Sequence, residues 1–492
     1  MSYLIKLHPE ITIKSRSARR QMTRCLTGNI RTILRRHDER IRVRDQWDSI
    51  RVRLPAGLSR ELTATIEDDL ARIPGIQEIL AAEDVPFVSL DDIAARLVPL
   101  WRPLIEGRRF RVKAKRRGRH DVTSEDIERH LGSALLHAAP SARVDLGHPE
   151  VVVPVELTND RVQVIRARWP GIGGYPLGVQ GQALALISGG FDSPVAAWRM
   201  MRRGVKTHFI FFNLGGPAHE AGVREVTHHL WARYGASHRV RFLSVPFEGV
   251  VGEILRSVPD GLMGVVLKRM MVRAAGRVAQ RARIPALVTG DAIAQVSSQT
   301  LTNLGQIDAA SPVPVLRPLL TEDKQAIIDQ ARDLDTARFA ETMPEYCGVI
   351  SRRPHIRTDA QRLEAAEADF DFSVLDAALE AAVTTRSDRL GEPARALGEV
   401  LTVDSPQALS AMHAPCVIDI RAPAQQEAAP LEVNEVPLLE IPFYELQDRA
   451  PTLPRDRQYL LFCDQGVMSR MQALHLADRG LEHFGVYRPE SR

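Results

Sequence analysis

The sequence predicts a multidomain chain that combines α+β units in its first third with α/β units in the remainder, and three observations support this. The chain has 492 residues, enough for three or four domains at about 150 residues each. Residues 1–168 mix strand-like and helical segments without a regular order. From residue 182, short apolar runs alternate with helical stretches, which is typical of a parallel, doubly wound sheet.

Two α+β units are expected at residues 1–60 and 61–168. In the first, YLIKL predicts a strand, a long stretch with apolar residues at helical spacing follows, and IRVRDQWDSIRVRLP alternates like a hairpin. In the second, two helical stretches precede the strand RRFRVKAKRRG, whose alternate residues are basic, and a third helix opens with a capping-box pattern at Thr123–Asp126. Strands in VDLGHPEVVVPVELTNDRVQVIRARW complete it, and PGIGGYPLGVQG predicts a linker.

Two α/β units are expected at residues 177–395 and 405–492. The strands of the first are ALALI, KTHFIFF, HRVRFLSV and PALVTGD. Those of the second are APCVIDIRA, PLLEIPF and QYLLFCDQG. An Ala-rich, mostly helical connection precedes the second unit.

Charge is distributed unevenly along the chain. Residues 1–170 carry a net +8, residues 171–358 a net +7 and residues 359–492 a net −11. The stretch 102–119 alone holds nine basic residues and one acidic residue. Such density suits a polyanion whose phosphates release counterions on binding, although a solvated basic face would look the same.

Composition excludes several classes. Hydrophobic residues make up 44% and charged residues 26%, which is ordinary for a soluble globular protein and unlike a disordered or collagen-like chain. No apolar run is long enough to span a membrane, and charges interrupt the N-terminus where a signal peptide would be apolar, so a cytoplasmic location is expected. The four cysteines show no CxxC spacing, so neither a disulfide framework nor a metal site is expected.

The strongest local signal is the segment LISGGFDSP at residues 186–194. An apolar strand runs into a Ser-Gly-Gly turn and directly into a helix. Adjacent glycines let backbone amides approach an anion, Ser188 and Ser193 add hydroxyl donors, and the helix N-terminus adds its positive end. The GK[ST] element of a Walker A loop is absent, and SGGFDS instead resembles the pyrophosphatase loop of the PP-loop ATPases.

Two further stretches fit the same pocket. Lys268 lies near the start of a helical stretch, and Gly290-Asp291 ends a strand that is followed by a polar segment with Gln299. Ligands bind at the carboxyl ends of such strands. Lys268 and Lys324 could neutralise phosphate charge. Taken alone, either lysine could equally be an ordinary surface residue with no ligand.

Cys463 lies in LLFCDQGVMSR, another strand–loop–helix junction. Backbone amides at a helix N-terminus favour a thiolate or persulfide anion. A cysteine phosphatase would need Arg six residues after the cysteine, but Ser469 occupies that position. The loop resembles rhodanese domains, which carry sulfur as Cys-S-SH, and so does the upstream VIDIRA at residues 417–422. For Cys25 and Cys416 an inert, buried thiol is the preferred interpretation.

The ordered set of KLHPEITIKS, the basic second unit, SGGFDS, MPEYCGVIS and LFCDQGVMSRMQALHLADRG resembles the bacterial tRNA 4-thiouridine synthetases in their long form. The resemblance covers essentially the whole chain. It implies an N-terminal ferredoxin-like domain, a THUMP domain for RNA binding, a doubly wound PP-loop ATP pyrophosphatase domain and a small rhodanese-like domain, at the four ranges given above.

The resemblance also implies site residues. Cys463, Cys347 and Asp192 would be catalytic: Asp192 would assist adenylation, Cys463 would carry the persulfide, and Cys347 would close a redox disulfide with Cys463. ATP, with Mg²⁺, would be bound by Leu186, Ile187, Ser188, Gly189, Gly190, Asp192, Ser193, Lys268, Gly290, Gln299 and Lys324. RNA would contact Arg108, Arg109, Arg111, Lys113, Lys115, Arg116 and Arg117.

The implied activity is ATP-dependent transfer of a persulfide sulfur to uridine 8 of tRNA, giving 4-thiouridine through an adenylated uridine. The implied partners are tRNA, a cysteine desulfurase, a thiol reductant and the sulfur-carrier protein of thiamine-thiazole synthesis; a homodimer stays open, as does attack by released sulfide. Two alternatives remain: a PP-loop sulfurtransferase acting only on a carrier protein or small molecule, and a non-enzymatic RNA-binding protein. The basic front argues against the first, and the intact SGGFDS and Cys463 against the second.

Overall fold

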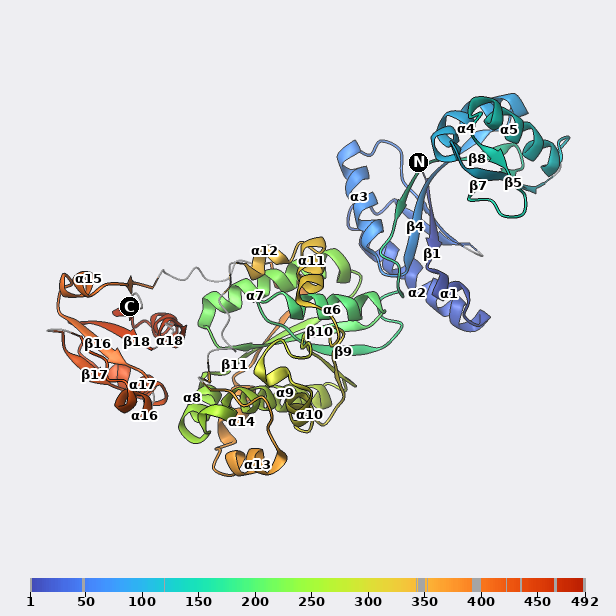
Figure 1. Ribbon diagram of the computed structural model, residues 1–492. Helices are drawn as coiled ribbons and strands as arrows, with labels where there is room; N and C mark the ends of the chain where they lie inside the picture. The colour runs from blue at the N-terminus through green and yellow to red at the C-terminus, as the bar shows by residue number, and fades with distance from the viewer. Residues whose placement is uncertain are drawn as a thin grey trace. The chain divides into compact units, whose positions relative to one another are not determined.

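The computed structural model describes residues 2–46, 49–118, 120–341, 343, 350–351, 353–391, 400–421, 423–433, 436–463 and 467–489. The chain divides into two compact units, Met1–Pro176 and Leu177–Arg492 (Figure 1). Among the described residues, no helix is both long and apolar enough to cross a membrane.

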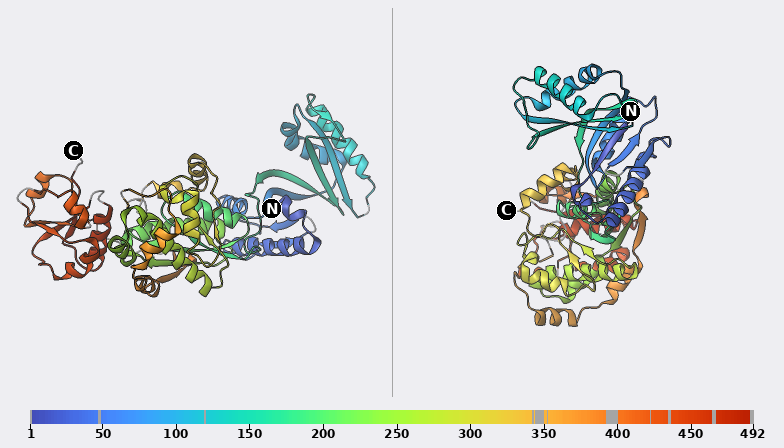
Figure 2. Two further views of the ribbon diagram at one scale, coloured as in Figure 1. Left: turned by 60° about the horizontal axis from the view of Figure 1, so that its bottom comes forward. Right: turned by 90° about the vertical axis from the view of Figure 1, so that its right-hand side faces the viewer.

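The first unit, drawn in blue to blue-green in Figure 2, is built on one eight-stranded sheet. Its strand order is β2-β3-β1-β4-β8-β7-β5-β6. The long strands β4 and β8 pair antiparallel in the middle and join the strands of both predicted α+β units into this sheet. The strands are β1 (Ser2–Leu7), β2 (Arg42–Asp45), β3 (Ser49–Arg53), β4 (Ile76–Pro86), β5 (Arg109–Arg117), β6 (Arg143–Val144), β7 (Val151–Thr158) and β8 (Arg161–Pro170).

Helices cover this sheet with apolar side chains. Val43, Ile50 and Val52 are buried on one side of β2 and β3, while the arginines that alternate with them lie on the other side. The Tyr3 hydroxyl on β1 donates a 2.7 Å hydrogen bond to Glu67 on α3, which fixes that helix to the sheet. The helices are α1 (Pro9–Thr12), α2 (Arg16–Leu34), α3 (Arg60–Arg72), α4 (Leu90–Ile105) and α5 (Ser124–Ala138).

The capping box predicted at the start of α5 is confirmed. The Thr123 hydroxyl accepts a 3.1 Å hydrogen bond from the Asp126 amide, and the Asp126 carboxylate accepts a 2.7 Å bond from the Thr123 amide. Two amides at this helix end that lack a partner within the helix are therefore satisfied.

The second unit begins with the predicted parallel sheet, in the order β13-β12-β9-β10-β11-β14. The chain moves outward from β9 to β10 and β11, then returns to the other side of β9 as β12. This reversal makes the crevice beside β9 the expected ligand site. The strands are β9 (Gln182–Leu186), β10 (Lys206–Asn213), β11 (Arg241–Pro246), β12 (Leu287–Val288), β13 (Val315–Leu316) and the antiparallel edge strand β14 (Val383–Arg386).

Helices lie on both faces of this sheet, as a doubly wound fold requires (Figure 1). A five-residue π-helix, Trp231–Gly235, continues α7 and was not predicted. The α-helices are α6 (Asp192–Arg202), α7 (Gly216–Leu230), α8 (Glu248–Ser257), α9 (Met263–Arg281), α10 (Leu301–Asp308), α11 (Lys324–Asp333), α12 (Ala337–Ala340), α13 (Ala360–Ala368) and α14 (Ser373–Glu380).

The last part of the chain forms a parallel five-stranded sheet in the order β15-β19-β18-β16-β17. Its three predicted strands are β16 (Pro415–Asp419), β17 (Leu438–Glu440) and β18 (Gln458–Phe462), and the structure adds β15 (Thr402–Val403) and β19 (Phe484–Tyr487) at one edge. The helices are α15 (Pro406–Ser410), α16 (Pro423–Ala428), α17 (Phe443–Arg449) and α18 (Val467–Asp478).

Candidate active site

A pocket of about 360 Å³ opens at the carboxyl ends of β9, β10 and β12. It lies at the crevice where the strand order reverses, which is the position expected for a ligand in this fold. All of the residues that were expected at ATP line this one pocket: Leu186, Ile187, Ser188, Gly189, Gly190, Asp192, Ser193, Lys268, Gly290, Gln299 and Lys324.

The phosphate loop between β9 and α6 is held in shape by its two serines. The Ser188 amide donates a 2.8 Å hydrogen bond to the Ser193 hydroxyl, and the two hydroxyl oxygens lie 2.9 Å apart. The Gly190 amide donates to the Ser188 hydroxyl at 3.4 Å. These bonds fold the Ser-Gly-Gly turn back onto the start of α6, so its backbone faces the pocket together with the helix N-terminus.

Glycine is required at the end of β12. A Cβ atom on Gly290 would lie 2.8 Å from the Asp192 carbonyl carbon and the Ser193 amide nitrogen. This distance is too short for real atoms, and both neighbours are backbone atoms that cannot turn away. Gly290 therefore lets β12 approach the phosphate loop closely.

Two cationic side chains reach the pocket, each from its own helix. The Lys324 Nζ atom at the start of α11 lies 2.7 Å from Asp192 Oδ1 in the phosphate loop. The Lys268 Nζ atom on α9 lies 2.7 Å from Asp291 Oδ1. Side-chain exposures of 49% and 21% show that Lys324 lies at the rim of the pocket and Lys268 lies deeper.

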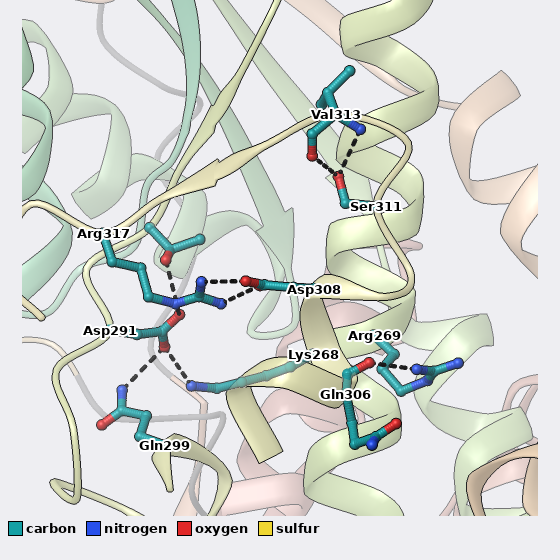
Figure 3. A network of polar contacts seen from close by, with 10 residues as sticks. Lys268, Arg269, Asp291, Gln299, Gln306, Asp308, Ser311, Val313 and Arg317 are labelled. Carbon is teal, nitrogen blue, oxygen red and sulfur yellow. Dashed lines mark hydrogen bonds and ion pairs between the residues drawn. The ribbon is translucent and has the colours of Figure 1, made fainter. Parts of the chain in front are cut away.

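Asp291, directly after Gly290, is the centre of a polar network (Figure 3). Its Oδ1 atom also accepts a 3.1 Å hydrogen bond from Gln299, and its Oδ2 atom accepts a 2.8 Å bond from Thr289. Burial raises the pKa of Asp291, but the charge and hydrogen bond of Lys268, the Thr289 hydroxyl and the Arg317 charge lower it more, so the pKa lies well below its ordinary value. Asp291 is therefore an anion that fixes two predicted ATP ligands.

Several residues around this pocket were not predicted from the sequence. Arg317 contacts both Asp291 and Asp308, and Met343 packs so closely on Gly189 that any side chain at residue 189 would overlap its sulfur. A charged residue directly after the apolar run Val313–Leu316 was a usable signal for Arg317. For Met343 the sequence holds no comparable signal.

The Cys463 loop follows β18 as predicted. Cys463 is 8% exposed, and its Sγ atom accepts a hydrogen bond from the Ser469 amide at 3.3 Å and lies 3.4 Å from the Ser469 hydroxyl. Ser469 is fully buried, whereas Arg470 is exposed. In the part of this loop that the structure describes, a serine rather than an arginine lies against the sulfur, which fits a thiolate or persulfide site better than a phosphatase.

A buried ion pair lies against Phe462, the last residue of β18, directly before Cys463. Arg421 donates to Asp419 through Nε at 2.9 Å and through a terminal nitrogen at 2.5 Å, and both side chains are almost fully buried. The Arg421 guanidinium also lies 5.0 Å from the centre of the Phe462 ring. The Asp-x-Arg segment singled out in the sequence thus packs against the residue before Cys463.

The three remaining cysteines are Cys25, Cys347 and Cys416. Cys347, predicted as the disulfide partner of Cys463, lies outside the described residues. Cys416 is buried as predicted, whereas Cys25 is only half-buried, and burial raises the pKa of both thiols. That both are inert stays a prediction.

Strand β5 carries most of the predicted RNA-binding residues. Arg109, Arg111, Lys113 and Lys115 alternate with Phe110 and Val112, which are buried, and with Ala114, which is half-buried, so the four basic residues share one face of the strand. Lys113 and Lys115 are exposed, as are Arg108 and Arg116, whereas the Arg117 side chain lies outside the described part of the chain. Arg109 and Arg111 already contact the loop at residues 145–150.

A second basic surface lies on the open face of β2 and β3, and its residues were not singled out from the sequence. Arg42 is directly opposite Arg53, and Arg44 is directly opposite Arg51. Like charges in such pairs repel one another, so this arrangement favours binding of an anion. The four arginines line a groove of about 670 Å³ together with Lys6 and Arg161. Its six basic residues leave a net charge of only +2, because four carboxylates also line it: Asp45, Asp84, Glu156 and Asp160. The Asp84 carboxylate lies 3.1 Å from Arg51.

Comparison with known proteins gives a consistent result. Three family profiles match in chain order: "ThiI ferredoxin-like domain" at residues 2–79, "THUMP domain" at 88–165 and "Thiamine biosynthesis protein (ThiI)" at 178–372. The proteins named tRNA sulfurtransferase from Klebsiella pneumoniae (strain 342) and Edwardsiella ictaluri (strain 93-146) are 50% and 49% identical over 489 residues, which is 99% of this chain and 100% of each relative. The chain belongs to the ThiI family.

A solved structure agrees with this family assignment. The crystal structure of a 4-thiouridine synthetase–RNA complex with bound ATP matches with a TM-score of 0.66 at 26% identity, over 78% of this chain and 99% of that chain. The predicted ferredoxin-like, THUMP and PP-loop folds of this ThiI family member are thereby confirmed. The rhodanese assignment of the C-terminal sheet stays a prediction.

Proposed function

We propose that this ThiI family member converts uridine 8 of tRNA to 4-thiouridine at the expense of ATP. One observation carries the proposal: all residues expected at ATP line one pocket, in a chain that is 50% identical over its full length to a protein named tRNA sulfurtransferase. The solved 4-thiouridine synthetase holds RNA and ATP. That combination favours an RNA substrate over a small molecule.

ATP would lie with its phosphates on the Ser188–Ser193 loop. The backbone amides of Gly189 and Gly190 and the N-terminus of α6 are donors suited to phosphate oxygens. Lys268 and Lys324 would neutralise phosphate charge. The Asp192 carboxylate is a suitable oxygen ligand for the Mg²⁺ that accompanies ATP, and this ion would screen the phosphates.

The first chemical step makes the uridine oxygen a good leaving group. The uridine O4 atom attacks the α-phosphorus of ATP, the bond to the β-phosphate oxygen breaks, and pyrophosphate leaves. The product is uridine with AMP on O4, so the C4–O bond can now break with departure of AMP. The cations at the phosphate loop would stabilise the charge that develops on pyrophosphate.

The second step delivers sulfur from Cys463. A cysteine desulfurase would load Cys463 as a persulfide, whose terminal sulfur attacks C4 and displaces AMP. The Cys347 thiolate then attacks the Cys463 sulfur, which releases 4-thiouridine and leaves a Cys347–Cys463 disulfide. A thiol reductant supplies the two electrons that reduce this disulfide for the next cycle. If sulfide is released instead, the Cys347 thiolate attacks the Cys463 persulfide first, which frees sulfide and forms the same disulfide. The sulfide then attacks C4 and displaces AMP, and the same reductant reduces the disulfide.

The basic surfaces of the first unit would hold tRNA by its phosphates. The arginines of β2 and β3 line one groove, and the exposed lysines of β5 add positive charge on the same sheet. Contacts of this kind position RNA by shape and charge, with little dependence on sequence.

A second function is favoured by one finding. The profile matching residues 178–372 is that of a thiamine biosynthesis protein. The same ATP pocket would adenylate the C-terminal carboxylate of a small sulfur-carrier protein, with loss of pyrophosphate. The terminal sulfur of the Cys463 persulfide would then displace AMP, and attack by Cys347 on the Cys463 sulfur would release the thiocarboxylate and form the disulfide that the thiol reductant reduces. The alternative of a sulfurtransferase acting only on this carrier leaves the basic surfaces of the first unit without a role.

A reconstituted assay tests the proposal. Full-length protein, ATP-Mg, unmodified tRNA, a cysteine desulfurase and cysteine are incubated, and 4-thiouridine is followed by its near-ultraviolet absorbance. The expected result is ATP-dependent formation of 4-thiouridine. Formation of AMP with the carrier protein but never with tRNA would overturn the tRNA proposal in favour of the alternative.

A further inference from the structure

Arg317 and Asp308 stand behind the nucleotide pocket without lining it. Arg317, directly after β13, is 7% exposed at its side chain, and its Nε atom lies 3.4 Å from Asp291 Oδ2. Its two terminal nitrogens donate to the two carboxylate oxygens of Asp308 at 2.9 and 2.6 Å. Figure 3 shows the Arg317 side chain between the two carboxylates.

The two carboxylate oxygens of Asp291 have different partners. Oδ1 accepts from Lys268 and Gln299, whereas Oδ2 accepts from Thr289 and lies 3.4 Å from Arg317 Nε. Lys268, Gln299 and Thr289 line the pocket and Arg317 does not, so Arg317 contacts the carboxylate from outside the ligand site. The four charged groups Lys268, Asp291, Arg317 and Asp308 together carry no net charge.

The charge balance around Asp291 affects how ATP can bind. Without Arg317, Asp291 would place an unbalanced negative charge beside the phosphates and would bind the Lys268 ammonium as its single counterion. With Arg317 in place, Asp291 is shared between two cations, so it attracts Lys268 less strongly and more of the Lys268 charge acts on the phosphates. Asp308 holds the guanidinium through two hydrogen bonds, which fixes its position.

We propose that Asp291 and Arg317 are positioning residues for ATP: Asp291 holds Lys268 and Gln299 at the pocket, and Arg317, held by Asp308, offsets part of the Asp291 charge from outside the pocket. The inference rests on the proposed function, since it takes Lys268 and Gln299 to be ATP ligands. A purely structural role of Arg317, as a tie between β13 and α10, makes a different prediction for variants that change charge and keep packing.

Isothermal titration calorimetry of ATP-Mg into the full-length protein separates these roles. We expect Arg317→Met to weaken ATP binding by about tenfold or more, the scale of one uncompensated charge near a partly buried group. Arg317→Lys keeps the charge but loses the two-bond fork on Asp308, so it should bind ATP less tightly than the wild type and more tightly than Arg317→Met. The double variant Asp291→Asn/Arg317→Met should recover to within about threefold, because the charge that Arg317 balanced is gone.

Thermal unfolding of each variant identifies those that are folded at the assay temperature. If Arg317→Met is unfolded there, Asp291→Asn alone carries the test. It should bind ATP at least as tightly as the wild type, while kcat for thiolation falls about tenfold because Lys268 and Gln299 lose their common anchor. Weaker ATP binding at an unchanged kcat would overturn the proposal.

Lys268→Met distinguishes a failure of the nucleotide site from a failure of the inference. If Lys268→Met binds ATP as the wild type does, the proposed nucleotide site is wrong and the inference falls with it. If Lys268→Met loses ATP while Arg317→Met keeps it, or if the double variant is as weak as Arg317→Met, the inference alone is overturned and the proposed function stands.

Discussion

Lys324 and Asp192 form an ion pair of 2.7 Å between Nζ and Oδ1, although 132 positions separate them in the chain. Lys324 is the first residue of α11, and Asp192 is the first residue of α6 beside the phosphate loop. The pair brings a half-exposed positive charge and the predicted catalytic carboxylate to the same rim of the pocket. Substitutions at this pair and at the contacts around it should therefore alter nucleotide binding.

Replacing Lys324 by Met should weaken ATP binding by about tenfold and lower the thiolation rate, because Asp192 and the phosphates lose the same cation. The affinity is measured by calorimetry and the rate by 4-thiouridine absorbance. Lys206→Met is the matched control, because Lys206 is the first residue of β10 and the pocket lies at the opposite, carboxyl end of that strand. Equal effects of the two substitutions would contradict the assignment of Lys324.

Gly290→Ala should abolish most ATP binding while the protein still folds. The added methyl group would lie 2.8 Å from backbone atoms of Asp192 and Ser193, so β12 and the phosphate loop must separate. Gly249→Ala on α8 is the control, because a methyl group there meets nothing within 4 Å. Unchanged nucleotide affinity in Gly290→Ala would show that this close approach is not needed for binding.

Ser469→Ala should slow alkylation of Cys463 by iodoacetamide about fivefold at neutral pH. The hydroxyl at 3.4 Å from Sγ can donate to a thiolate, and one such hydrogen bond is worth about 1 kcal/mol. Mass spectrometry of the tryptic peptide gives the rate for this thiol separately from Cys25 and Cys416. An alkylation rate equal to that of the wild type would exclude a role for the Ser469 hydroxyl at the sulfur.

Arg44→Glu combined with Arg53→Glu should weaken tRNA binding by about tenfold or more at low salt. Each substitution removes a cation that would bind a phosphate, so the dependence of log K on log salt should become shallower by about 0.7–0.9 for every phosphate that is no longer neutralised. Arg60→Glu at the start of α3 is the control, because it changes the charge by half as much on an exposed arginine away from the groove. If Arg60→Glu has the same effect per charge, net charge alone explains binding and the groove does not.

Stability should fall as the pH drops from about 6.5 to about 4. Burial lowers the pKa of His219 from 6.5 to about 4, so the unfolded chain binds a proton in this window and the folded protein does not. The contribution is on the order of 2–3 kcal/mol for this residue. Urea denaturation at a series of pH values measures it, and His219→Gln should reduce the slope; an unchanged slope would mean that other groups cause the fall in stability.

The predictions from sequence succeeded where one pattern dominates the local structure. The strand–glycine–helix junction at Ser188 and the capping box at Thr123 are short-range features, and each has the predicted geometry. Strand β4 was not predicted because its burial pattern departs from alternation. Its register shifts between Ala81 and Ala82, so consecutive residues there are buried and the two-residue period is lost.

Some residues of the candidate site could be predicted from the sequence and others could not. Lys268, Gly290 and Gln299 follow from motif resemblance and from the rule that ligands bind at strand ends, and the structure places them in one pocket. The apolar run before Arg317 was a usable signal for that residue, but its contacts with Asp308 and Asp291 join different elements and depend on the tertiary fold. Likewise, the pairing of Arg42 with Arg53 depends on the register of a hairpin.

The most direct test of the proposed mechanism is the reconstituted thiolation assay with three proteins: wild type, Asp192→Ala and Cys463→Ser. We predict that the near-ultraviolet band of 4-thiouridine grows with ATP in the wild type and is absent in both variants. Asp192→Ala should still carry a persulfide on Cys463, and Cys463→Ser should still form AMP. A band of wild-type size in either variant would contradict the assignment of adenylation to the phosphate loop or of sulfur transfer to Cys463.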